Sequence, residues 1–252
     1  MKAIVEIRKV RLGEGAPKIC VSMTGRTREA LREEAALLRT IDLDLAEWRV
    51  DFFEGVDSPE KVLEMLAELR LLLGPVPLIF TFRSAREGGQ RELAADDYIG
   101  LNAAAAASGH ADAIDVELFA GDEAVRRLTA EARRFGAVSI VSNHDFDKTP
   151  PAEELAARLR RMRKLGGDVP KIAVMPRDPG DVLALLQATY AVSSDNEGPI
   201  ITMSMGRLGA VSRVAGGTFG SALTFGAAKN ASAPGQLAAA DLRGLLGALH
   251  GE

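Results

Sequence analysis

The chain has 252 residues, of which 47% are hydrophobic and 26% charged, and this composition excludes a disordered protein. Its net charge of -4 lacks the basic excess of a general nucleic-acid-binding protein. The single cysteine, Cys20, allows no internal disulfide and suits a reducing compartment. No segment reaches the roughly 20 apolar residues of a membrane helix, and the charged N-terminus lacks the apolar core of a signal peptide. We therefore expect a soluble, cytoplasmic protein that binds neither nucleic acid nor membrane.

Short β-rich runs alternate with helical segments along the chain. Helical patterns cover 26–40, a segment after Ser58 and Pro59, and a segment between Thr149 and Arg163. This repeat predicts an α/β protein with a parallel (β/α)8 TIM barrel, and a doubly wound open sheet is the alternative. No linker divides the chain, so we expect one domain over 1–252, with an extra strand or hairpin at 3–10 closing the barrel floor. The expected strands are 18–23, 44–49, 77–82, 112–117, 137–142, 170–175, 199–204 and 222–225.

Polar side chains interrupt strands that should be apolar on both faces. Because alternate residues of a strand share a face, these side chains point into the barrel near the carboxyl ends of the strands, where barrel enzymes keep their chemistry. A structural ion pair explains Glu47 and Arg49 equally well, but polar residues at five successive strand ends are harder to attribute to packing. They are Glu47, Arg49, Asp51, Thr81, Arg83, Asp115, Glu117, Ser142, His144 and Lys171.

Two of these residues have the chemistry of a covalent catalyst. A desolvated Lys171 beside other cations would lose its proton and become an amine nucleophile, whereas a lysine that reaches up to water is the simpler alternative. His144 follows the adjacent strand and suits a general acid or base, although a lone histidine is more often structural. Glycine-rich loops at 83–89 and 231–236 are candidate lids. Residues 205–209 resemble a phosphate-binding turn of barrel enzymes.

Several segments together resemble type I 3-dehydroquinate dehydratase, the Schiff-base-forming enzyme of the shikimate pathway of aromatic amino-acid biosynthesis. The resemblance implies a homodimeric TIM barrel, without metal or organic cofactor, that converts 3-dehydroquinate to 3-dehydroshikimate by syn elimination. Asn143 departs from the aromatic residue of many members, and 216–218 from a segment that more often holds a glutamate. The matching segments are 47–51, 81–84, 87–89, 142–146, 170–176, 203–206, 212–213, 219–226 and 231–236.

The resemblance also implies a role for each site residue. Lys171 would form an imine with the C3 ketone. His144 would remove a C2 proton and later protonate the departing C1 hydroxyl, with Glu87 orienting its ring. The implied substrate-binding residues are Arg213, Ser232 and Gln236 for the carboxylate, Glu47, Arg49 and Arg83 for the ring hydroxyls or one another, and Ser22 as a further contact.

Two other functions remain open from the residues alone. Lys171 would also fit a class I aldolase that binds a sugar phosphate near 206–209. A barrel that binds a metabolite without catalysis is the third possibility, although a binding protein needs no poised amine.

Overall fold

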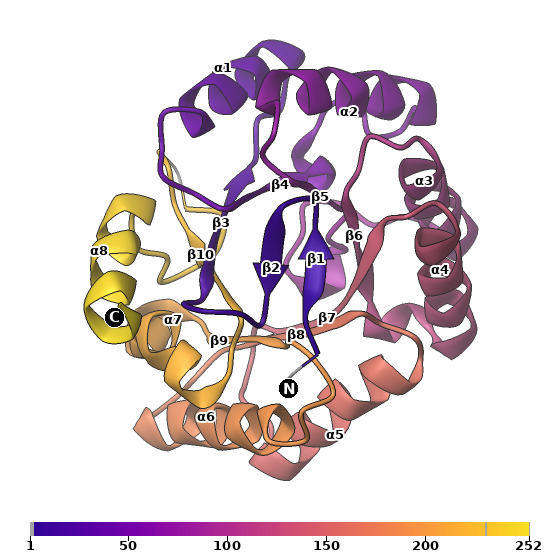
Figure 1. The fold of residues 1–252 in the computed structure, drawn as a ribbon. Coiled ribbons are helices and arrows are strands. Elements are labelled where there is room, and N and C mark those ends of the chain that lie inside the picture. The colour runs from indigo at the N-terminus through magenta and orange to yellow at the C-terminus, as the bar shows by residue number, and fades with distance from the viewer. Residues whose placement is uncertain (1–2, 230, 252) are drawn as a thin grey trace.

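Every segment expected to be a strand is one in the computed structural model, which describes residues 3–229 and 231–251. The strands form one parallel sheet in the order β10-β3-β4-β5-β6-β7-β8-β9, and a bridge between Ile200 and Ser221 joins its two edges (Figure 1). The (β/α)8 barrel is therefore confirmed, and the open-sheet alternative is wrong. The strands are β3 (Lys18–Met23), β4 (Leu45–Arg49), β5 (Leu78–Thr81), β6 (Ala113–Glu117), β7 (Val138–Asp145), β8 (Val169–Val174), β9 (Ile201–Ser204) and β10 (Leu223–Gly226).

The helices form a ring around the barrel (Figure 1). The Ser58 hydroxyl caps the second helix by accepting from the backbone of Lys61, as the Ser-Pro sequence predicts. In the described parts of the chain, no helix has the length and apolar character needed to cross a membrane. The helices are α1 (Arg28–Leu38), α2 (Pro59–Leu73), α3 (Ala95–Ala107), α4 (Asp122–Arg134), α5 (Ala152–Lys164), α6 (Pro179–Ser193), α7 (Gly206–Phe219), α8 (Ala239–His250) and the short 3-10 turns η1 (Val50–Phe52), η2 (Ala85–Glu87) and η3 (Leu118–Ala120).

A β-hairpin closes the floor of the barrel, as the sequence predicts. It consists of β1 (Val5–Ile7) and β2 (Val10–Leu12), so the chain turns near Arg8 instead of running as one strand over 3–10. Ile7 and Leu12 are buried against the apolar residues at the amino ends of the barrel strands. The hairpin thus lies at the end opposite the polar strand ends.

The inward-facing residues of the barrel form an apolar layer below a polar one. Cys20, Leu45, Ile79, Ala113 and Ile140 belong to the lower layer. Because side chains alternate along a strand, the next inward residue lies two positions further on. Those positions form the upper layer and hold Ser22, Glu47, Thr81, Asp115, Ser142, Lys171, Met203 and Phe225.

The floor hairpin should stabilise the fold without touching the site. Leu12 is 0% exposed, so Leu12→Ala should lower the free energy of unfolding by about 2–5 kcal/mol, measured by urea denaturation. Leu71→Ala is the matched control, because Leu71 is 82% exposed and its truncation should cost about 0.5 kcal/mol or less. Equal destabilisation by the two substitutions would contradict a structural role for the hairpin.

Candidate active site

Lys171 reaches into the upper layer of the barrel from β8 and is buried among carboxylates. Its Nζ donates to Asp115 Oδ2 at 2.9 Å and lies 3.7 Å from Glu47 Oε1. It also lies 4.7 Å from the centroid of the Phe225 ring. The nearest charged groups are therefore acidic, not the cations that we expected to deprotonate this amine. Its burial also makes the alternative of a lysine that reaches water wrong.

Asp115 is fully buried and joins Lys171 to the rest of the site. Its Oδ1 accepts from Arg83 Nη2 at 2.8 Å and from the Ser142 hydroxyl at 2.5 Å. Burial alone would raise the pKa of Asp115, but the charges of Arg83 and Lys171 outweigh burial and hold it well below the usual carboxyl range. Asp115 is therefore a fixed anion at the centre of the barrel.

Glu47 and Arg49 do not form the ion pair that their spacing suggested. Glu47 accepts from the hydroxyls of Ser22 at 2.5 Å and Thr81 at 2.9 Å. Arg49 instead binds both carboxylate oxygens of Asp51, each at 2.8 Å. The expected pairing is wrong because η1 turns the chain directly after β4 and brings Asp51 to the guanidinium.

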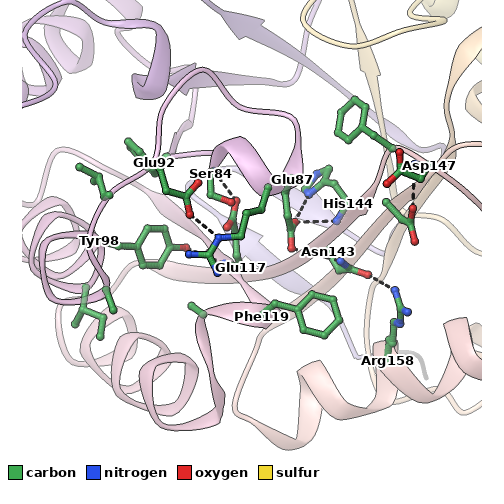
Figure 2. A pocket seen from close by; sticks show the side chains of 18 residues that line it. Ser84, Glu87, Glu92, Tyr98, Glu117, Phe119, Asn143, His144, Asp147 and Arg158 are labelled. Carbon is green, nitrogen blue, oxygen red and sulfur yellow. Dashed lines mark hydrogen bonds and ion pairs between the residues drawn. The ribbon is translucent and has the colours of Figure 1, made fainter.

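Glu87 holds the imidazole of His144. Its Oε2 accepts from the backbone N–H of His144 at 2.8 Å and lies 2.9 Å from the ring Nδ1 (Figure 2). Burial raises the pKa of Glu87 to about 8, although Arg83, 3.5 Å away, opposes this rise. Burial, with Arg83 and Lys171, lowers the pKa of His144 well below its usual value. When Glu87 is ionised, the proton stays on Nδ1 and leaves Nε2 as a free base.

Arg213 is a buried cation without an acidic partner. It extends from α7, is 2% exposed, and donates through Nη2 to the carbonyl of Pro234 at 3.0 Å. Within the described residues, no carboxylate pairs with it and its Nε has no hydrogen-bond partner. Burial accordingly lowers the pKa of Arg213 to about 10. A buried charge without a counter-ion is costly, so this guanidinium is suited to receive an anion.

The loop between β10 and α8 closes over these residues. Ser232 and Gln236 bind each other through two hydrogen bonds, of 2.8 and 2.9 Å. The backbone N–H of Gly206 donates to the carbonyl oxygen of Pro234. In the turn at 205–209, which resembled a phosphate-binding turn, this N–H is therefore already occupied. Gly235 has a φ of +76°, and a Cβ there would lie 2.1 Å from the Gly206 carbonyl. Only glycine therefore lets the loop lie this close to α7.

The loop lines one side of a cavity of about 40 Å³. All the predicted site residues meet at this cavity, with Ser22 reaching it through Glu47. Among the described residues, no cluster of acidic, histidine or cysteine side chains is arranged to bind a metal. The residues lining the cavity include Glu47, Arg49, Arg83, Glu87, His144, Lys171, Arg213, Ser232 and Gln236.

Three acidic residues of this network were not predicted as site residues. The alternation of β6 placed Asp115 and Glu117 on the inner face, which was a usable signal. Glu117 accepts from Arg83 Nη1 and from the backbone of Ser84, both at 2.8 Å. The same alternation placed Asp51 on one face with Glu47 and Arg49, although in the structure Asp51 lies beyond β4 in η1.

Closure of the loop should depend on Gly235. Gly235→Ala should raise KM for 3-dehydroquinate, the substrate that the resemblance implies, by about 10-fold or more, because a side chain is disfavoured at this φ and collides with Gly206. Steady-state kinetics checks this, with Gly244→Ala as the control, because a Cβ at Gly244 meets nothing within 4 Å. An unchanged KM in the Gly235 variant would show that loop closure does not contribute to binding.

Comparisons with known proteins identify the family of the chain. The family model for type I 3-dehydroquinase matches residues 19–252. The 3-dehydroquinate dehydratase of Bacillus licheniformis is 53% identical over 251 residues, covering 99% of both chains. The crystal structure of the type I enzyme from Clostridium difficile with covalently modified comenic acid has a TM-score of 0.96 and 48% identity, covering 99% of each chain. The chain therefore belongs to the type I 3-dehydroquinase family, whose members are hydro-lyases that dehydrate 3-dehydroquinate.

Proposed function

We propose that this chain dehydrates 3-dehydroquinate to 3-dehydroshikimate by syn elimination, through a Schiff base on Lys171. The observation that carries the proposal is one cavity lined by a buried amine, an imidazole held through Nδ1, and a guanidinium that has no acidic partner among the described residues. The relative crystallised with covalently modified comenic acid supports covalent chemistry in the family.

Arg213 is the residue best suited to bind the substrate carboxylate. Among the described residues, no acidic side chain pairs with this buried arginine, whereas Arg49 and Arg83 are already paired. A bidentate carboxylate would supply the missing counter-ion. Ser232 and Gln236 would exchange their mutual hydrogen bonds for bonds to the same carboxylate, which links loop closure to binding. Glu47, Arg49, Arg83 and Ser22 remain for the ring hydroxyls.

The imine forms in two steps. Nε2 of His144 accepts a proton from the Lys171 ammonium, and the free amine attacks the C3 carbonyl to give a carbinolamine. His144 returns that proton to the hydroxyl of the carbinolamine, which departs as water and leaves a protonated imine and a neutral His144. Asp115 and Glu47, at 2.9 and 3.7 Å from Nζ, stabilise the positive charge that the nitrogen regains in this intermediate.

Elimination follows at the neighbouring carbon atoms. Nε2 of His144 removes the C2 proton, and the electron pair moves into the protonated imine to form an enamine. The enamine expels the C1 hydroxyl, which takes a proton from His144 and departs as water. A second water hydrolyses the imine, so the cycle releases the unsaturated ketone and restores Lys171. Proton transfer by a positioned histidine contributes about 10²–10⁴-fold to such reactions.

Three further expectations extend the proposal. We propose that residues 1–252 form one catalytic domain, that it works in the shikimate pathway in the cytoplasm, and that it acts as a homodimer. The lone cysteine suits a reducing compartment. The dimer is supported by α6 and α7, where Leu183, Tyr190, Leu208 and Val211 are exposed and the sequence has no charge between 182 and 194. The uncharged stretch of α6 can meet its own copy across a two-fold axis without repulsion.

The covalent step is tested by reduction with borohydride. The chain incubated with 3-dehydroquinate and borohydride should gain the mass of one reduced ligand on the peptide that contains Lys171. Lys171→Ala should lose both the adduct and nearly all of the rise in enone absorbance, whereas Lys164→Ala, on the exposed face of α5, should keep both. Wild-type turnover in the Lys171 variant would refute the imine mechanism.

Retro-aldol activity on a sugar phosphate alone would favour the aldolase, and binding without any adduct would favour a non-catalytic barrel.

The role of Arg213 is tested by its neutral analogue. Arg213→Gln should raise KM for 3-dehydroquinate by about 10- to 100-fold, the usual value of a hydrogen bond to a charged group. Arg207→Gln, at the exposed start of the same helix, is the control and should leave KM unchanged. If both variants bind substrate as the wild type does, the carboxylate is held elsewhere.

A further inference from the structure

A second and larger cavity lies against the outer side of the Glu87–His144 pair. Its volume is about 430 Å³, and Glu87 and His144 are among the residues that line it (Figure 2). The same two residues also line the smaller cavity beside Lys171. Asn143, Phe119 and Arg158 line only the outer cavity. Residues that take no part in the proposed reaction therefore lie directly behind the base.

Three side chains form a chain of hydrogen bonds from α5 to His144. Arg158 Nη1 donates to Asn143 Oδ1 at 2.8 Å, and Asn143 Nδ2 donates to Glu87 Oε1 at 3.4 Å (Figure 2). The other carboxylate oxygen of Glu87 lies 2.9 Å from Nδ1 of His144. Asn143 is only 2% exposed, so no bulk water competes for its amide.

Arg158 determines which way the Asn143 amide points. A guanidinium can only donate hydrogen bonds, so the atom of Asn143 that faces it must be the oxygen. The amide nitrogen then faces Glu87 and offers it a donor. A donor beside a carboxylate stabilises the ionised form.

Arg158 is itself held from two sides. It pairs with Glu154 one turn earlier on α5, and its guanidinium carbon lies 5.5 Å from the centroid of the Phe119 ring. These contacts leave Nη1 directed at Asn143, so the orientation of the amide is fixed before any ligand binds.

From this geometry we propose that Arg158 is a positioning residue: acting through Asn143, it keeps Glu87 an acceptor and so keeps the proton of His144 on Nδ1. The proposal rests on the proposed function for its catalytic consequence. If Glu87 were protonated it would donate to Nδ1, and the ring proton would move to Nε2, where it blocks the base.

Opposing charges act on the carboxylate of Glu87, so one hydrogen-bond donor can change how much of it is ionised. Arg83 favours the ionised carboxylate, whereas Glu117 on β6 opposes it. Burial is the largest effect and brings the pKa of Glu87 to about 8, close to neutral pH. The loss of one donor would therefore change the ionised fraction at working pH.

The pH profile of kcat/KM tests this inference. Arg158→Met frees the amide to rotate, which raises the pKa of Glu87, so the acid limb should move to higher pH by about 0.5 to 1 unit. Arg158→Lys should bring the acid limb part of the way back to its wild-type pH, because the lysine ammonium can also only donate hydrogen bonds. Arg160→Met is the control, because Arg160 pairs with Asp195 on the exposed side of the same helix.

A double variant separates action through Asn143 from a direct effect of charge. Asn143→Leu should shift the acid limb in the same direction, and adding Arg158→Met should produce no further shift. Additive shifts, or an Arg158→Met profile equal to that of the control, would overturn the proposal.

A second readout does not depend on the proposed reaction. The ring ¹⁵N resonances of His144, recorded without substrate over the same pH range, should show the proton moving from Nδ1 to Nε2 at a higher pH in Arg158→Met than in the wild type. An unchanged tautomer transition would overturn the positioning role even if the chain proved to catalyse another reaction. The expected shift in a chain without dehydratase activity would support the positioning role and refute only the proposed function.

Discussion

The site depends on one carboxylate that has no exposed surface. Asp115 binds the amine of Lys171, the guanidinium of Arg83 and the hydroxyl of Ser142 at the same time. Removing one partner of such a buried cluster would leave an uncompensated charge, so the cluster fixes the positions of all its members. Arg83 continues the network to Glu117 and Glu87, and Glu87 holds His144. Lys171 and His144, the proposed nucleophile and base, are thereby connected through fixed charges.

The groups around Lys171 determine which steps its amine needs in the proposed reaction. The sequence predicted neighbouring cations, but the charged groups nearest to the nitrogen are the carboxylates of Asp115 and Glu47. They suit the protonated imine, which carries its charge at that atom. In the proposed mechanism, His144 therefore has to take the first proton. Arg213, in contrast, is a buried cation, and in the proposed mechanism it binds the carboxylate of the substrate.

Much of this architecture could be predicted from the sequence, because it follows from local periodicity. Alternation along β4, β6 and β8 placed Glu47, Asp115 and Lys171 on one inner layer, and the resemblance supplied distant members such as Arg213 and Gln236. The pairings could not be predicted. The partner of Arg49 depends on how η1 turns. That Arg213 has no acidic partner among the described residues depends on every element around it. The pKa directions of Glu87 and His144 follow from burial, which exists only in the folded chain.

The most direct test is a crystal structure of the chain after reduction with borohydride in the presence of 3-dehydroquinate. The account predicts continuous density from Lys171 Nζ to C3 of the ligand, with the ligand carboxylate on Arg213 and the His144 ring beside C2. Density joined to another lysine, or a carboxylate distant from Arg213, would contradict it.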